Sequence, residues 1–373
     1  MKSFTFYSPT EVIFGRDTEL QVADEIKKHG GTRVLAVYGG GSVVKSGLLE
    51  RVEKSLEKGG LPFLSVGGVS PNPRLSFARD GVKKAKEFGA DFILAIGGGS
   101  VIDTAKAIAH GVANPETDIW LYWTKKASLT KSSPVGVILT ISAAGSETSD
   151  SAVLTNLETG EKRGLNTPFN RPRFAIMNPE LTYTLPPFQI SCGIVDIMMH
   201  TLDRYFTLTE GNELTDEFAE ALLRVVIQNG PAAMKNPHDY DAMSELMWCG
   251  SISHNGMTGL GRVVDFAVHQ LGHELSGKFD VAHGASLSTL WGSWARYCYR
   301  TKPERFARFA DKVWGIRRDS AEEAANAAID RTVAYFASLG MPTCFTELGI
   351  GIQSEEILNQ LADSCMFFGK RKI

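Results

Sequence analysis

The chain has few of the features that would place it outside the globular, intracellular proteins. Its 373 residues contain five scattered cysteines and no CxxC pair, which is typical of reduced thiols in a cytoplasmic protein. No apolar run reaches the length of a membrane span, and the N-terminus lacks the apolar core of a signal peptide. A net charge of −3 gives no electrostatic argument for binding nucleic acid or an anionic membrane. We therefore expect a cytoplasmic protein without nucleic-acid or membrane partners.

The first half of the chain alternates short apolar runs with amphipathic stretches. A hydrophobic content of 43% and a length of 373 residues favour a globular protein of two domains. The alternation predicts a parallel sheet covered by helices on both faces. We expect strands at 33–39, 63–68, within 91–100 and at 135–142, and helices at 43–60, 75–90 and 101–113.

The second half has a different pattern, with long stretches of helical periodicity and hardly a strand. The change follows the double proline Pro186-Pro187, which blocks helix continuation and marks a plausible boundary. We expect an α/β domain over 1–185 and an all-helical domain over 186–373. The helical periodicity is clearest at 213–229, 240–258, 262–275, 284–298 and 302–314.

Glycine-rich turns follow several of the expected strands. Gly97–Ser100 leads from a strand into a helix, and Gly39–Ser42 repeats the arrangement. Such turns let the backbone approach a ligand, and the N–H groups of the following helix favour a phosphate. The spacing is not GxGxxG, and any tight turn can use glycine. A third turn at 138–150, with small hydroxylated residues, strengthens the prediction of a dinucleotide lying across the sheet edge.

Histidines and one aspartate are concentrated in the expected helical domain. Asp196 and His200 are four residues apart, as are His269 and His273, so each pair lies on one face of a helix. Either pair alone is more often a salt bridge or a packing feature, and His283 alone is more often a helix cap. Together they place one carboxylate and several imidazoles in apolar sequence, where ionisable groups are costly unless paired or metal-bound. The set predicts a divalent metal site.

Six motifs make the chain resemble the group III, iron-containing alcohol dehydrogenases, in particular the branch of NADP-preferring aldehyde reductases and butanol dehydrogenases. They are PNP at 71–73, GGGSVIDTAKAIA, AAGSETS, MNPELTYTLPP, GIVDIMMH and HQLGHELSGKFDVAHG. The resemblance implies a Rossmann-like domain joined to a helical domain, as in dehydroquinate synthases, with the site in the cleft between them. It also implies a homodimer that interconverts primary alcohols, such as butanol, and aldehydes with NADP(H).

The resemblance assigns roles to individual residues. The metal ligands are Asp196, His200, His269 and His283, which would hold Fe²⁺ or, as an alternative, Zn²⁺. His273 is expected beside the nicotinamide as a catalytic residue and not on the metal. The expected cofactor contacts are Gly40, Ser42, Asn72, Gly98, Gly99, Ser100, Asp103, Thr140, Ser146, Lys162 and Thr184.

Two departures from the family pattern bear on these expectations. Ala144 stands where relatives often have a hydroxylated residue, which leaves one nucleotide contact in doubt. Family members usually continue past FFGKRKI with a further helix, so the C-terminus is expected to be short.

The choice of cofactor depends on the turn at Gly40. NAD-preferring relatives carry an aspartate there, which would bind the ribose hydroxyls and repel a 2′-phosphate. With Gly40, the backbone N–H groups, the Ser42 hydroxyl and Lys45 are available to a phosphate, which predicts a preference for NADP(H). Glycine could also be merely permissive, so that both cofactors bind.

Two other functions fit the same domain organisation. A cyclase of the dehydroquinate synthase type would need basic residues around a phosphorylated polyol, and the helical half shows no Lys/Arg cluster beside the ligands. A nucleotide-binding protein with a structural metal would hold its ion in a closed coordination shell, with no position for an exchangeable water.

Overall fold

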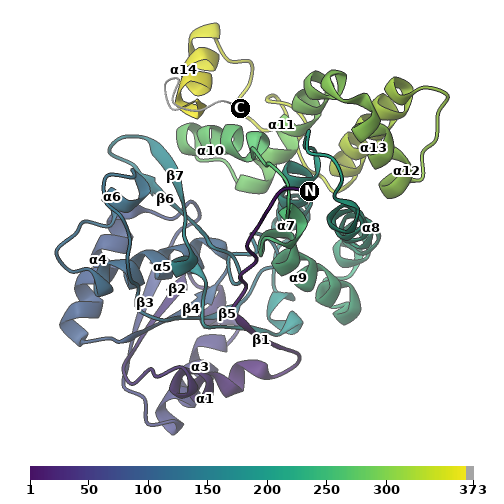
Figure 1. Cartoon of the computed structure of the whole chain (residues 1–373). Helices are drawn as coiled ribbons and strands as arrows, with labels where there is room; N and C mark the ends of the chain where they lie inside the picture. Colours follow the sequence, from purple (N-terminus) through teal and green to yellow (C-terminus); the bar gives the residue numbers. More distant parts are fainter. Residues whose placement is uncertain (367–373) are drawn as a thin grey trace. The chain divides into compact units, whose positions relative to one another are not determined.

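The computed structural model describes residues 1–366, which form two compact units (Figure 1). One unit is Tyr7–Leu185, and the other combines Met1–Phe6 with the chain from Pro186 onward. The expected class, an α/β domain followed by a helical one, is confirmed. The expectation of a short C-terminus concerns 367–373, which lie outside the described residues. Within the described chain, no helix is both long and apolar enough to cross a membrane.

The first unit is built on a six-stranded sheet whose pairings are all parallel, in the order β1-β8-β5-β4-β2-β3. From β2 the chain crosses to β3 at the sheet edge and then returns past β2 to β4, so the strand order reverses between β2 and β4. Sheets of this kind bind ligands outside the carboxyl ends of the strands, where the strand order reverses. The strands are β1 (Glu11–Phe14), β2 (Val34–Gly39), β3 (Phe63–Val69), β4 (Phe92–Gly97), β5 (Val135–Leu139) and β8 (Phe174–Met177).

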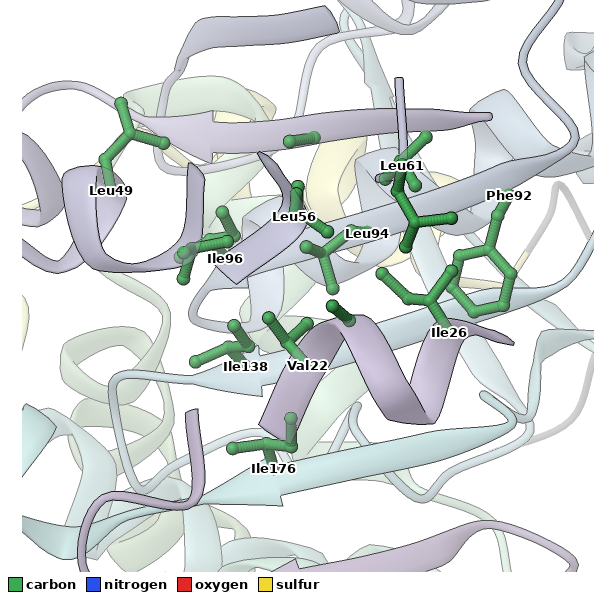
Figure 2. Close-up of a cluster of buried hydrophobic side chains, with 14 of the residues drawn as sticks. Val22, Ile26, Leu49, Leu56, Leu61, Phe92, Leu94, Ile96, Ile138 and Ile176 are labelled. Carbon is green, nitrogen blue, oxygen red and sulfur yellow. The ribbon is translucent and has the colours of Figure 1, made fainter. Parts of the chain in front are cut away.

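Both faces of this sheet are buried, as parallel sheets require. On one face, α1 (Val22–Lys28) and α3 (Leu48–Lys58) pack on alternate strand residues, and Figure 2 shows Val22 and Ile26 of α1 close to Leu94 and Phe92. Helices α4 (Leu75–Phe88) and α5 (Gly99–Ala113) contact the strands in a separate set of packing interactions. The sheet therefore fixes where each strand ends and where each following turn begins.

The structure corrects three details of the α/β prediction. The helix expected at 43–60 is broken into α2 (Ser42–Lys45) and α3, because Gly47 between them adopts φ +71°. An antiparallel hairpin that was not predicted, β6 (Ser151–Asn156) and β7 (Glu161–Asn166), follows the third turn. Strand β8 was also missed, because it is only four residues long. Strand β1 lies within the N-terminal segment 1–15, whose alternation of apolar and polar residues is typical of a strand.

The second unit is helical, and α7 lies at its centre. Its first residue is Pro187, a favoured first residue of helices, and its residues from Gly193 to Tyr205 are all buried. Helix α7 packs against α8, α9, α10 and α11. The helices of this unit are α7 (Pro187–Tyr205), α8 (Glu213–Lys235), α9 (Tyr240–His254), α10 (Ala267–Phe279), α11 (His283–Cys298), α12 (Pro303–Trp314), α13 (Ala321–Ser338) and α14 (Glu355–Cys365).

The ends of three helices differ clearly from the prediction, and the helix expected at 240–258 ends at His254. Helix α8 continues past 229 through Pro231 to Lys235. The helix expected at 262–275 begins only at Ala267, because Phe266 adopts a left-handed conformation with φ +56°, and it extends to Phe279. A left-handed conformation is uncommon for a bulky residue and stops the helix from extending towards the N-terminus.

Candidate active site

Three helices of the second unit bring the expected metal ligands together. Asp196 and His200 come from α7, and Asp203 follows on the same face of that helix. His269 comes from the first turn of α10, and His283 is the first residue of α11. The four expected ligands therefore come from separate segments that meet around one buried helix face.

Glycines allow α10 and α11 to approach their neighbours closely. A Cβ at Gly284 would collide with the backbone of Cys192 in α7, so only glycine fits there. A Cβ at Gly272 in α10 would lie 2.9 Å from side-chain atoms of Leu287 and Ser286 in α11. The glycine that follows His283 therefore serves the close packing of α11 on α7.

The ligand atoms converge on one carboxylate oxygen. Asp196 Oδ1 lies 3.6 Å from His200 Nδ1, 3.5 Å from His269 Nε2 and 3.8 Å from His283 Nε2. Ligand atoms about 2.1 Å from one tetrahedral ion lie roughly 3.4 Å from one another. Among the described residues, Asp196 Oδ1, His200 Nδ1 and His269 Nε2 have no hydrogen-bond partner although they are buried. Buried polar atoms left in this way fit a shared divalent ion.

Asp203 orients one of these imidazoles. Its Oδ2 accepts a hydrogen bond of 2.7 Å from His269 Nδ1 and a second one, 3.2 Å long, from the His269 backbone N–H. With the proton on Nδ1, the Nε2 lone pair faces Asp196, which is how metal-bound histidines are commonly held. Burial opposes the charged form of His269, but the neighbouring carboxylates of Asp196 and Asp203 outweigh it, so the pKa of His269 is raised.

His200 is held in its neutral form. Burial, followed by the neighbouring His254, keeps the pKa of His200 well below its usual range. The His254 ring lies 4.0 Å from the His200 ring, measured between centroids. A neutral imidazole keeps a lone pair for a metal.

Arg204 holds the surroundings of His200 in place. Its guanidinium donates to the carbonyls of His200 and Ser253, contacts His254 Nδ1 at 3.1 Å and lies over the Phe266 ring. Sequence reasoning missed Asp203, Arg204 and His254. Asp203 could have been found, because it lies seven residues after Asp196 on the same helix face.

His273 and His283 lie at the more open side of the cluster. The His283 side chain is 26% exposed, whereas those of Asp196, His200 and His269 are 5–6% exposed. The ring of His273 lies 5.3 Å from that of His283. Within the described chain, the group whose ligand atoms all lie within 4.8 Å of one another is Asp196, His200 and His269, and it includes neither His273 nor His283. His283 Nε2 nevertheless lies 3.8 Å from Asp196 Oδ1.

Most of the expected cofactor residues of the first unit lie just beyond the carboxyl ends of parallel strands. Gly40 and Ser42 follow β2, Asn72 follows β3, and Thr140 follows β5. Gly98, Gly99 and Ser100 lead from β4 into α5, whose free N–H groups can bind a phosphate. Thr184 follows β8 after a short helical turn. Because all the strands are parallel, these turns lie along the same edge of the sheet.

The glycines at the start of α5 are needed for packing as well. A Cβ at Gly98 would collide with Ile141, and one at Gly99 would lie 2.9 Å from the Ala144 Cβ. The third turn therefore lies directly against the start of α5. At Gly40, by contrast, an added Cβ would meet no atom within 4 Å. The space at Gly40 is open to a ligand or to a larger side chain.

The other expected cofactor residues are engaged with one another. Lys162 Nζ of β7 donates to Asn72 Oδ1 at 2.9 Å, and both side chains are buried. The Ser146 hydroxyl donates to Asp103 Oδ1 at 2.6 Å, and Asp103 Oδ2 accepts from the Val153 backbone N–H. The unpredicted hairpin β6–β7 thus supplies contacts to both pairs.

In comparisons with known proteins, both parts of the chain match the same protein family. Residues 9–179 match the family described as iron-containing alcohol dehydrogenase, and residues 190–371 match the C-terminal part of the Fe-containing alcohol dehydrogenase family. An NADH-dependent butanol dehydrogenase A of Clostridium acetobutylicum is 39% identical over 97% of this chain and 93% of its own length. An NADPH-dependent aldehyde reductase of Escherichia coli is 35% identical over 98% of this chain and 94% of its own length. The crystal structure of an NADH-dependent butanol dehydrogenase A from Thermotoga maritima superposes with a TM-score of 0.95 at 36% identity, over 100% of this chain and 92% of that one.

Proposed function

Because the chain belongs to the iron-containing alcohol dehydrogenase family, we propose that it interconverts short primary alcohols, such as butanol, and their aldehydes with NADP(H) in preference to NAD(H). It is an oxidoreductase acting on CH–OH groups, with small-molecule alcohols and aldehydes as substrates. The observation that carries the proposal is the convergence of three imidazole nitrogens on Asp196 Oδ1.

Asp196, His200, His269 and His283 would hold one divalent ion. One carboxylate with three imidazoles suits Fe²⁺, the ion in the family's name, and also suits Zn²⁺. The partial exposure of His283 supports a catalytic site over a closed structural one, because a catalytic metal keeps a position open to substrate. The bound ion would supply a Lewis acid for the substrate oxygen, and the nicotinamide would supply or accept the hydride.

The chain's own residues prepare the site for this chemistry. Asp203 fixes the His269 tautomer, and Arg204 holds the backbone of His200, so the ligands are oriented before substrate arrives. His273, placed beside His283, would relay the proton of the alcohol, a role that suits an imidazole.

The sheet edge would bind the cofactor through its turns. The N–H groups at the start of α5 favour the pyrophosphate. The relatives include both NADH- and NADPH-dependent enzymes, so the preference rests on the residues of this chain. At Gly40, which is exposed, no carboxylate repels a 2′-phosphate, and the Ser42 hydroxyl and Lys45 are exposed nearby.

The functional form would be a cytoplasmic homodimer. Strand β1 is at the edge of the sheet, paired on one side with β8, and a free edge can pair with a second copy. Just before it, Phe4, Phe6 and Tyr7 are large exposed apolar residues. Light scattering that shows a monomer at micromolar concentration would remove the dimer from the proposal. Among the described residues the five cysteines form no disulfide, in keeping with a reducing compartment.

A single assay series tests the proposed activity. Butanal reduction would be followed by oxidation of NADPH or NADH on chelator-treated protein and on the same protein reloaded with Fe²⁺ or Zn²⁺. We expect no turnover without a metal and a preference for NADPH of about tenfold, because a charge-assisted phosphate contact contributes about 1.5–3 kcal/mol. Full turnover of the metal-free protein would contradict the metal-dependent mechanism, and equal efficiency with both cofactors would contradict the preference alone.

A further inference from the structure

Lys106 is a fully buried lysine in the middle of α5. It is 0% exposed, and its Nζ donates to the Ser146 carbonyl at 2.7 Å, the Ser146 hydroxyl at 2.8 Å and the Ser151 carbonyl at 2.7 Å. The Ser149 carbonyl lies further away, at 3.4 Å. An ammonium group has three protons, so the three short bonds use all of them. Lys106 therefore has no donor left for a ligand.

All the acceptors of Lys106 belong to one segment, residues 140–151, which we call the serine loop. The loop begins with Thr140 at the end of β5 and leads into β6. The Ser146 hydroxyl accepts from Lys106 and donates to Asp103, so it joins two opposite charges that both come from α5. Asp103 also accepts from the backbone N–H of Val153, just beyond the loop. Both charged side chains thus hold the loop to one helix.

The other end of the serine loop lies against the turn that begins α5. Ile141 occupies the space where a Gly98 side chain would be, and Ala144 abuts Gly99. A shift of the loop would therefore change the shape of the turn whose N–H groups face a phosphate. Thr140 and Ser146, two expected cofactor contacts, are themselves part of the loop.

We propose that Lys106 is a positioning residue for the nicotinamide cofactor, which it serves by fixing the serine loop against the start of α5 without touching the cofactor. This inference rests on the proposed binding of the cofactor at the sheet edge. A purely structural lysine would be expected to stabilise the fold alone, and cofactor affinity in the folded enzyme would not depend on it.

The charges around Lys106 explain why its ammonium is retained in the core. Burial lowers the pKa of Lys106 to about 8, while Asp103, Glu147 and Asp150 favour its charged form. Arg171 acts in the opposite direction. The lysine is thus still mainly charged at neutral pH, with the Asp103 carboxylate as its largest electrostatic partner.

The test compares Lys106→Met with Lys84→Met in the metal-loaded enzyme. Lys84 is a surface lysine of α4 in the same unit, forms an exposed ion pair with Asp80, and serves as the matched control. We expect Lys106→Met to raise the Kd and KM for NADPH at least tenfold. Metal content, the KM for butanal and kcat at saturating NADPH should change less than twofold, and Lys84→Met should change none of these. A folded Lys106→Met enzyme whose Kd for NADPH stays within twofold of the wild type would overturn the proposal.

Methionine leaves the buried Asp103 carboxyl without its charged partner, which can prevent folding. Lys106→Gln is therefore the second variant, because its amide keeps two donors for the loop carbonyls without a charge. We expect its Kd for NADPH to rise at least threefold, and an unchanged Kd in the folded variant would again overturn the proposal.

Gly99→Val separates this inference from the proposed cofactor site. If wild-type enzyme binds NADPH and Gly99→Val abolishes binding, the cofactor site stands whatever Lys106 does. If Gly99→Val binds NADPH normally, the cofactor does not bind at this turn. The proposed cofactor site is then wrong, independently of the role of Lys106.

Discussion

Replacing Asp203 by asparagine should weaken metal binding while leaving all four expected ligands in place. Asp203 is 2% exposed, and its bond to His269 Nδ1 is 2.7 Å long, within the range of a charge-assisted hydrogen bond. An asparagine keeps the size of the side chain but loses the charge, and its amide can present N–H groups to the donors of His269. The imidazole is then free to rotate or to change tautomer, so Nε2 is no longer held towards Asp196.

The expected magnitude follows from the role of Asp203 behind a single ligand. Partners that orient metal ligands typically contribute about 10- to 100-fold in metal affinity. That factor corresponds to roughly 1.4–2.8 kcal/mol in binding free energy. The assay is competition between apo-protein and a chromophoric chelator for Zn²⁺, which avoids oxidation of Fe²⁺.

The control for this measurement is Asp311→Asn. Asp311, on α12, accepts a hydrogen bond from the Arg317 guanidinium in an exposed ion pair. Its replacement makes the same aspartate-to-asparagine change at a site away from the expected metal ligands. The control should bind Zn²⁺ as the wild type does. If folded Asp203→Asn protein also bound Zn²⁺ within twofold of the wild-type affinity, orientation of His269 by Asp203 would have no part in the site.

Three further predictions concern the cofactor, the proton and the buried lysine. Gly40→Asp should erase or reverse the NADPH preference, because the open space at Gly40 accepts a carboxylate that repels a 2′-phosphate. The ratio of kcat/KM for NADPH to that for NADH measures the preference, and an unchanged ratio in the variant would refute the prediction. His273→Ala should keep one metal per chain but lower kcat, most visibly in alcohol oxidation, and loss of the ion would instead make His273 a ligand. Burial lowers the pKa of Lys106 from 10.5 to about 8, so between these pH values the unfolded chain binds more protons than the folded one. This group therefore makes the free energy of unfolding rise with pH from about 8 to 10.5. Urea denaturation should show that rise in the wild type and not in Lys106→Met.

Local patterns predicted most of the first unit and the main features of the second. The apolar runs before Gly39 and Gly97 are strands because both faces of the sheet are buried, so hydrophobicity alone marks them. The pairs Asp196/His200 and His269/His273 lie on helices, where four-residue spacing fixes a common face. These features depend on residues that are near one another in sequence.

The features that were missed depend on contacts between distant residues. Asp203 acquires its role from His269, 66 residues later, and Arg204 contacts His254 50 residues later. Spacing also could not separate His273 from His269, because only the packing of α10 against α7 decides which imidazole faces Asp196. The hairpin β6–β7 has a signal in the sequence, two short runs of alternating polar and apolar residues around a turn at Glu158–Gly160. Its contacts with Asn72 and Asp103 have no such signal, because they join residues far apart in the sequence.

The metal content of purified wild-type protein and of His269→Ala, measured side by side by elemental analysis, tests the central claim most directly. His269 Nε2 lies 3.5 Å from Asp196 Oδ1 and is buried, so no water-exposed group can replace it without rearrangement. We predict one divalent ion per chain in the wild type, and neither metal nor turnover in the variant. A folded His269→Ala protein that keeps one ion per chain would contradict the assignment of this cluster as the catalytic metal site.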